Sequence, residues 1–140
     1  MNRIFIVDGA RTPFLKARTE PGPFSAADLA VACARPVLAR QPFPASKLDE
    51  VIVGCVIPAA DEANIARLIA LRLGCGQRVP AHSVQRNCAS GLQALATAAE
   101  RIALGRAQLV LAGGTEAMSR APIQWNIAMV GWLGKMLRAR

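Results

Sequence analysis

The chain has 140 residues, of which 53% are apolar and 19% are charged. This composition excludes an intrinsically disordered chain and is sufficient for one packed domain or a part of one. The formal net charge is +8 at pH 7. The arginines are nevertheless scattered singly, and no aromatic residues are interleaved with them as in a groove for single-stranded nucleic acid. We therefore expect a basic, solvated surface and no nucleic-acid partner.

The four cysteines lack the close spacing of a zinc or redox site, which favours a reducing compartment without a bound metal. They are Cys33, Cys55, Cys75 and Cys88. The apolar run at residues 4–7 is too short for the core of a signal peptide. No apolar run approaches the roughly 18 residues that a membrane span requires. These features predict a cytoplasmic protein without a membrane span.

The first expected elements are a short strand and a helix. Residues 4–7 are apolar and end at a turn-prone Asp-Gly pair, which favours a buried strand over a helix. Ser25 precedes Asp28 by three residues, a near-match to a capping box. A helix should begin there and run towards Arg35, and Pro36 should kink or end it.

Strands alternate with helices along the following residues. β-Branched apolar runs predict the strands, and apolar residues at helical spacing predict the helices. The expected strands are residues 51–57, 82–85 and 109–112, and the expected helices are residues 64–73 and 92–102. Such alternation is typical of an α/β fold with a mixed, mainly parallel sheet covered by helices.

The pattern breaks after Pro122, in an apolar tail that contains Trp125 and Trp132 and ends in basic residues. Two interpretations of this tail remain open. It can be an amphipathic helix that binds a membrane surface, or a segment that packs against further protein.

Cys88 is the candidate nucleophile because it lies between the strand expected at residues 82–85 and a long apolar helix. At such a junction, unpaired backbone N–H groups and the helix dipole stabilise a thiolate. The same groups, including the N–H of Cys88 itself, can stabilise the oxyanion of a tetrahedral intermediate. The small Ala89, Ser90 and Gly91 permit a sharp turn. From spacing alone, an inert buried cysteine is equally compatible.

The segment Asn-Cys-Ala-Ser-Gly-Leu-Gln-Ala, which begins at Asn87, is similar to the nucleophile motif of the thiolase family. Three further segments resemble the family in the same order: residues 7–14, 64–67 and 109–119. Gln85 and Thr115 depart from the asparagine and methionine that are frequent in the family. We interpret both as variation within it.

The resemblance implies the layered thiolase fold, which contains two related α/β halves of the βαβαβ type. Residues 1–121 would form most of the first half, left incomplete. Residues 122–140 would begin the inserted loop region that covers the acyl-CoA site and would be truncated. The resemblance also implies homo-oligomers that pair through the strand at residues 82–85.

The implied activity is acyl transfer, a reaction of fatty acid metabolism. Cys88 would accept an acyl group from coenzyme A, followed by Claisen condensation with acetyl-CoA or, in reverse, thiolysis of a 3-ketoacyl-CoA. Coenzyme A would be a substrate, with no bound cofactor and no metal. The family's catalytic histidine and second cysteine belong to motifs that this sequence lacks, so we expect little activity from the chain alone.

The resemblance assigns two groups of residues around Cys88. A supporting turn would contain Asn87, Ala89, Ser90 and Gly91, and a loop near the site would contain Gly113, Gly114, Glu116 and Met118. We expect the two glycines to form a tight turn rather than a phosphate-binding loop. Glu116 is more consistent with a structural carboxylate than with a catalytic acid. His82, Cys33, Cys55 and Cys75 are likewise expected to be structural.

Two other functions remain open. A ketoacyl-synthase-like condensing enzyme also places a cysteine between a strand and a helix, although residues 113–119 favour a thiolase. The chain can also be a non-catalytic fragment or one half of a split enzyme.

Overall fold

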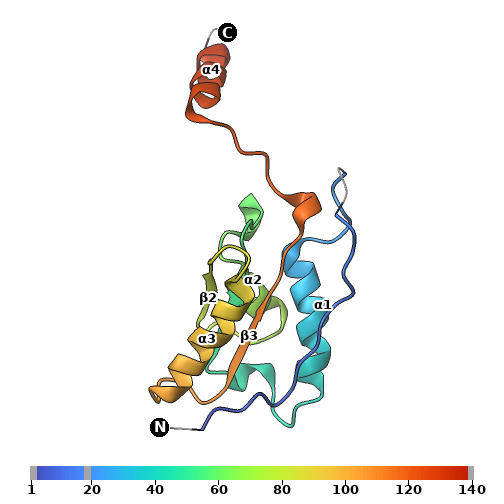
Figure 1. The fold of residues 1–140 in the computed structure, drawn as a ribbon, viewed down its shortest axis with the longest axis vertical. Coiled ribbons are helices and arrows are strands. Elements are labelled where there is room, and N and C mark those ends of the chain that lie inside the picture. The colour runs from blue at the N-terminus through green and yellow to red at the C-terminus, as the bar shows by residue number, and fades with distance from the viewer. Residues whose placement is uncertain (1–2, 18–19, 139–140) are drawn as a thin grey trace.

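The computed structural model describes residues 3–17 and 20–138 (Figure 1). The helices are α1 (Ala26–Ala39), α2 (Ile65–Arg72), α3 (Ser90–Ala103) and α4 (Ile127–Arg138). The strands are β1 (Glu50–Gly54), β2 (Ala81–Val84) and β3 (Val110–Gly114). Short 3-10 helices lie at Ala45–Lys47, Ala60–Glu62 and Met118–Arg120.

The three strands form one parallel sheet in the order β2-β1-β3. Gly54, the last residue of β1, is in register with Val84 of β2 and Gly114 of β3. The carboxyl ends of all three strands therefore lie at the same edge of the sheet. Every residue of the central strand β1 is buried, as expected for a parallel strand that is covered on both faces. The prediction of an α/β fold is confirmed.

Helices cover both faces of the sheet, and the alternation of side chains along β1 decides which core each residue joins. Val51 and Val53 belong to the larger core, which α1 and α2 complete. Ile52 points to the other face and packs with Ala94 and Ala98 of α3. The two alanines are small, so α3 can lie close to the sheet.

The helix expected after Ser25 is present and longer than predicted. Its capping box is formed: the Asp28 N–H donates to Ser25 Oγ (3.2 Å), and the Ser25 N–H donates to Asp28 Oδ2 (2.9 Å). Pro36 does not end the helix, which continues to Ala39. Proline deprives the Ala32 carbonyl of its helical donor. Because Ala32 and Pro36 are both exposed, water can solvate that carbonyl.

The prediction of a strand at residues 4–7 is wrong. These residues form no strand, and each of their side chains is at least 42% exposed. An extended segment needs a neighbouring strand to satisfy its backbone groups, and none of the described strands pairs with it. The segment is held instead through Asp8, which accepts hydrogen bonds from Arg40 (2.9 Å) and Gln41 (2.8 Å) beyond the end of α1.

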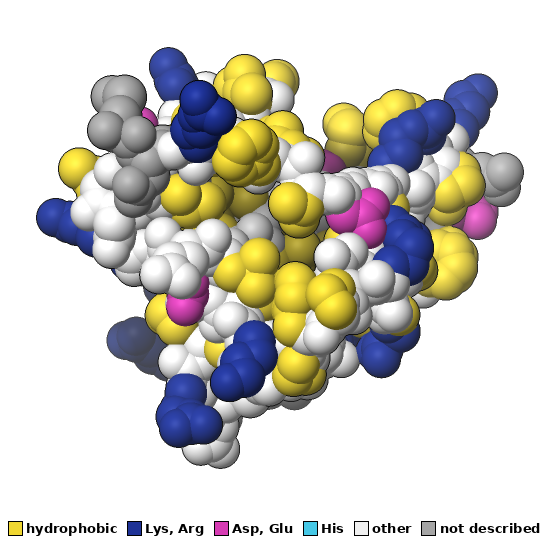
Figure 2. Space-filling view, turned by 90° about the horizontal axis from the view of Figure 1, so that it is seen from below, with side chains coloured by type: hydrophobic (Ala, Val, Ile, Leu, Met, Phe, Trp, Pro, Cys, Tyr) yellow, Lys and Arg dark blue, Asp and Glu magenta, His cyan; other side chains and the backbone are white. Residues whose placement is uncertain are grey.

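The tail contains α4, which stands away from the body of the molecule at the end of an extended stretch (Figure 1). At the opposite end, Lys and Arg side chains are spread around a hollow that exposes hydrophobic side chains (Figure 2). On this face the Lys and Arg side chains are dispersed, in line with the scattered basic residues of the sequence. None of the described helices is long and apolar enough to span a membrane. The proposed boundary between residues 121 and 122 stays a prediction.

Candidate active site

A tight turn connects β2 to α3 and carries Cys88. Asn87 has a φ of 49°, in the left-handed region that asparagine adopts more readily than most residues. The Ala89 N–H donates to the Arg86 carbonyl and the Ser90 N–H to the Asn87 carbonyl, both at 3.0 Å. Cys88 is exposed at this turn, so its thiol is accessible to a substrate.

The Ser90 side chain stabilises the turn through two hydrogen bonds to its backbone. The side chain is buried, donates to the Asn87 carbonyl (2.6 Å) and accepts from the Arg86 N–H (2.8 Å). The two bonds therefore hold the chain before Cys88 against the first residue of α3. The Arg86 guanidinium also donates to Gln93 Oε1 (2.7 Å), which ties the same turn to the next turn of the helix.

Three glycines let the start of α3 approach the carboxyl ends of β1 and β3. A Cβ atom at Gly54 would lie 2.3 Å from the Ser90 carbonyl carbon and oxygen. A Cβ atom at Gly114 would lie 2.9 Å from the Gly91 Cα. Real Cβ atoms do not come this close to backbone, so both positions require glycine. Sequence reasoning missed Gly54, whose one signal is a glycine at the end of a buried apolar run.

The expectation for Gly113 and Gly114 needs correction. They are not a turn after a strand but the last two residues of β3, in register with Val53 and Gly54 of β1. Parallel pairing extends to Gly114 because Gly54 of β1 is its partner. Gly114 has no side chain, which leaves room for Gly91 of α3. The following residue continues the connection, since the Thr115 N–H donates to the Gly54 carbonyl (3.0 Å).

Glu116 connects the segments that follow β1 and β3. Its Oε2 accepts from the Val56 N–H (2.9 Å), and its Oε1 lies 3.6 Å from the Cys55 thiol. Burial and the neighbouring Glu116 carboxylate raise the pKa of Cys55 to about 12. The Cys55 thiol therefore stays protonated at neutral pH, and Glu116 is engaged in structural contacts.

The other cysteines differ from Cys88 in exposure. Cys75 is buried, and burial raises the pKa of its thiol. Cys33 is half-buried. None forms a disulfide, and Cys88 has the most accessible thiol of the four. The described residues contain no group of histidine, cysteine and acidic side chains that could hold a metal ion.

His82, the only histidine of the chain, has a carboxylate partner within the fold. Its Nδ1 lies 3.2 Å from Oε1 of the buried Glu50, whose Oε2 accepts from Arg101 Nε at 2.8 Å. Glu50 thus joins β2, β1 and α3, a role that the sequence did not indicate. With His82 at this position, the sequence offers no second histidine as a base for Cys88.

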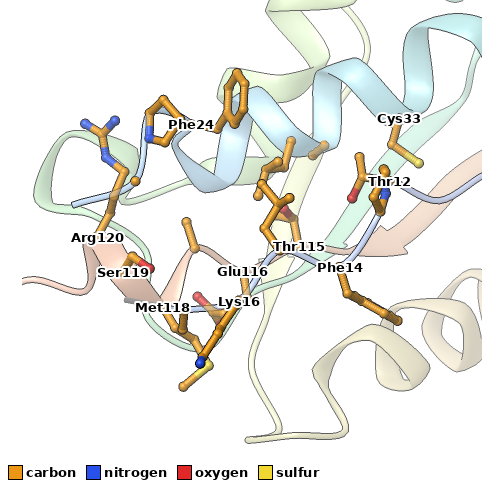
Figure 3. Close-up of a pocket in the computed structure, with 18 of the residues that line it drawn as sticks. Thr12, Phe14, Lys16, Phe24, Cys33, Thr115, Glu116, Met118, Ser119 and Arg120 are labelled. Atoms are coloured by element: carbon orange, nitrogen blue, oxygen red, sulfur yellow. The ribbon is translucent and has the colours of Figure 1, made fainter. Parts of the chain in front are cut away.

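A cleft of about 700 Å³ lies beside α1 (Figure 3). The N-terminal loop and the segment after β3 form it, with side chains that include Phe14, Lys16, Glu116, Met118 and Arg120. Gly114 lines the cleft and also contacts Gly91. Three of the residues expected near the site, Gly114, Glu116 and Met118, therefore meet at this cleft. Cys88 does not line it.

The family model for the thiolase N-terminal domain matches residues 4–135. The chain belongs to the thiolase family. It is 39% identical over 131 residues to a 3-ketoacyl-CoA thiolase of Bacillus subtilis, covering 91% of this chain and 33% of that protein. It is 40% identical over 129 residues to the mitochondrial trifunctional enzyme subunit beta of Bos taurus, covering 92% and 27%.

Solved thiolase structures share the fold. An acetyl-CoA acetyltransferase of Bacillus anthracis superposes with a TM-score of 0.70 at 39% identity, covering 74% of this chain and 26% of that one. A thiolase of Ascaris suum in complex with coenzyme A gives 0.72 at 28% identity, covering 85% and 30%. The chain thus spans about a quarter to a third of the length of these thiolases. Because the relatives include bacterial and mitochondrial proteins, the cytoplasmic compartment stays a prediction.

Proposed function

We propose that this chain supplies the nucleophile of a thiolase-type acyltransferase and that Cys88 forms the acyl-enzyme thioester. The observation that carries the proposal is the exposed Cys88 thiol on a turn that Ser90 braces at the start of α3. The names of the relatives, among them 3-ketoacyl-CoA thiolase, support an acyl-CoA as the substrate.

In the proposed step, the Cys88 thiolate attacks the thioester carbonyl after the thiol has lost its proton to solvent. A new carbon–sulfur bond forms, the bond to the coenzyme A sulfur breaks, and coenzyme A leaves as a thiolate that takes up a proton. Within the described chain the Cys88 N–H has no acceptor, so it can donate to the oxyanion.

The second step would join the acyl group to acetyl-CoA in a Claisen condensation or, in reverse, cleave a 3-ketoacyl-CoA with coenzyme A. Condensation requires a base that removes a proton from the acetyl-CoA methyl group. Neither His82 nor Cys55 is suited to act as this base. His82 pairs with Glu50, and the Cys55 thiol stays protonated. We therefore propose that the chain alone is acylated but turns over slowly.

We also propose that the full enzyme is a homo-oligomer that pairs along β2. This strand lies at the edge of the sheet, and its outer side has no partner among the described strands. The free backbone groups of such an edge can accept a strand from a second copy.

Intact-mass spectrometry after incubation with acetyl-CoA tests the acyl-enzyme. We expect a single acetyl adduct on the wild type and none on Cys88→Ala. Cys33→Ala, which removes the half-buried thiol of Cys33, is the control and should retain the adduct. Equal acetylation of the wild type and Cys88→Ala would contradict the proposal. So would absence of the adduct together with equal alkylation rates at Cys88 and Cys33.

A further inference from the structure

Helix α3 begins without a side-chain cap. Its N-cap residue is Ala89, which has no side-chain acceptor for the N–H groups of the first turn. A missing cap lowers the stability of a helix start. Gly91 lies in the same turn and lowers its helix propensity further. The start of α3, next to Cys88, therefore needs support from outside its first turn.

A bridge of side chains reaches from the segment before Cys88 to the body of α3. The Arg86 guanidinium donates to Oε1 of Gln93, the fourth residue of the helix, at 2.7 Å. Gln93 Nε2 donates in turn to Thr97 Oγ1 at 3.2 Å. A contact between a residue before the N-cap and the fourth helical residue fixes the angle at which the chain enters the helix, as in the hydrophobic staple. Here the contact is polar.

Cys88 lies in the chain between the two ends of this bridge. The hydrogen bonds of Ser90 fix the backbone within the turn itself. The bridge fixes the turn relative to the part of α3 that packs on the sheet, because Ala94, next to Gln93, is buried against Ile52. The two sets of contacts are therefore complementary.

We propose that Arg86 and Gln93 are positioning residues for the acylation of Cys88, an inference that rests on the proposed function of that thiol. The bridge substitutes for the missing cap and keeps the first turn of α3 formed. The orientation of the Cys88 thiol and N–H depends on that turn. A capping side chain at residue 89 would be adjacent to Cys88, where an acyl-CoA has to approach, whereas the bridge acts from one helical turn away.

The rate of Cys88 acetylation by acetyl-CoA, followed by intact-mass spectrometry, tests the bridge in the full chain. Arg86→Leu and Gln93→Leu should each slow acetylation about three- to tenfold, the effect of one hydrogen bond. The double variant should be no slower than either single variant, because all three lack the same bond. Gln93→Glu keeps an acceptor for Arg86 and should stay within about twofold of the wild type.

Amide hydrogen exchange, measured by NMR, reports on the first turn of α3 independently of acetylation. In Arg86→Leu, which leaves the helix sequence unchanged, the amide hydrogens of residues 93–95 should exchange about three- to tenfold faster. Those of α2 should exchange as in the wild type. Glu100→Leu, at an exposed position further along α3, is the control and should leave acetylation and exchange at residues 93–95 within about twofold of the wild type.

Four results would overturn the proposal. They are unchanged exchange at residues 93–95 in Arg86→Leu, equal acceleration in α2, a double variant whose loss of rate is the product of the two single losses, and a Gln93→Glu variant as slow as Gln93→Leu. A wild type that is not acetylated would contradict the function proposed for Cys88. The exchange measurement would still decide whether the bridge holds the first turn.

Discussion

Ser90 shows how a single residue positions the candidate nucleophile. Its hydroxyl bonds to the carbonyl of Asn87 and the N–H of Arg86, the two residues that precede Cys88. The hydroxyl thus completes the hydrogen bonding of a turn in which Asn87 adopts a left-handed conformation. The sequence indicated that Ser90 is small but not that its side chain is buried under the turn.

Replacement of Ser90 by alanine should destabilise the protein and slow acylation. The Arg86 N–H would lose its partner, and the Asn87 carbonyl would keep only the Ser90 N–H, which costs about 1–3 kcal/mol of unfolding free energy. Urea denaturation measures this loss, and mass spectrometry with acetyl-CoA measures the acetylation rate of Cys88. Ser46→Ala, at an exposed hydroxyl, is the control and should change neither quantity. Unchanged stability and acetylation in Ser90→Ala would show that the hydroxyl does not brace the turn.

The junction of α3 with the sheet is the element that places the candidate site. Gly54 and Gly114 end neighbouring strands and are in register with each other. The first turn of α3 lies against both of them, within van der Waals distance of backbone atoms. The N-terminal end of the helix dipole is thereby fixed at the carboxyl edge of the sheet.

Gly54→Ala should displace α3 from the sheet. The added methyl group would meet the Ser90 carbonyl at 2.3 Å, and backbone cannot move aside as a flexible side chain can. We expect a loss of at least about 2 kcal/mol of unfolding free energy, measured by urea denaturation. Gly113→Ala is the matched control at the end of β3, where a Cβ atom meets nothing within 4 Å. Equal losses in the two variants would contradict the assigned contact.

At the scale of the whole molecule, Glu50 links elements that are distant in the sequence. The carboxylate is buried in β1 and contacts His82 on β2 and Arg101 on α3. A buried carboxylate is stable only when hydrogen bonds or charges compensate for its desolvation. These contacts hold the edge strand and α3 to the central strand.

Glu50→Gln should destabilise the fold by about 2 kcal/mol or more, because Arg101 loses its buried counter-charge. Glu100→Gln removes an exposed carboxylate from the same helix as Arg101 and should change stability by less than about 0.5 kcal/mol. Thermal and urea denaturation of both variants provide the comparison. A Glu50→Gln protein as stable as the wild type would show that the buried contacts add no net stability.

The elements that local sequence defines were predicted in the right places, although the strand expected at residues 51–57 ends at Gly54. The helix after Ser25, the apolar runs of the three strands and the cysteine between β2 and α3 all follow from patterns within a few residues. The strand prediction at residues 4–7 was wrong for the opposite reason. Their apolar composition suits a strand, but strand pairing depends on a partner that is distant in the sequence. Pro36 also failed as a helix stop, because the exposed side of α1 tolerates a missing hydrogen bond.

The sequence by itself determined the order of strands and helices, the family resemblance and the candidate nucleophile, because periodicity, capping and a contiguous motif are local properties. The tertiary structure alone decided the roles of Gly54 and Glu50 and the partners of Glu116. Their contacts are close approaches and hydrogen bonds between residues about 30 to 60 positions apart. Such contacts arise only when the strands pair in register and the helices pack onto them.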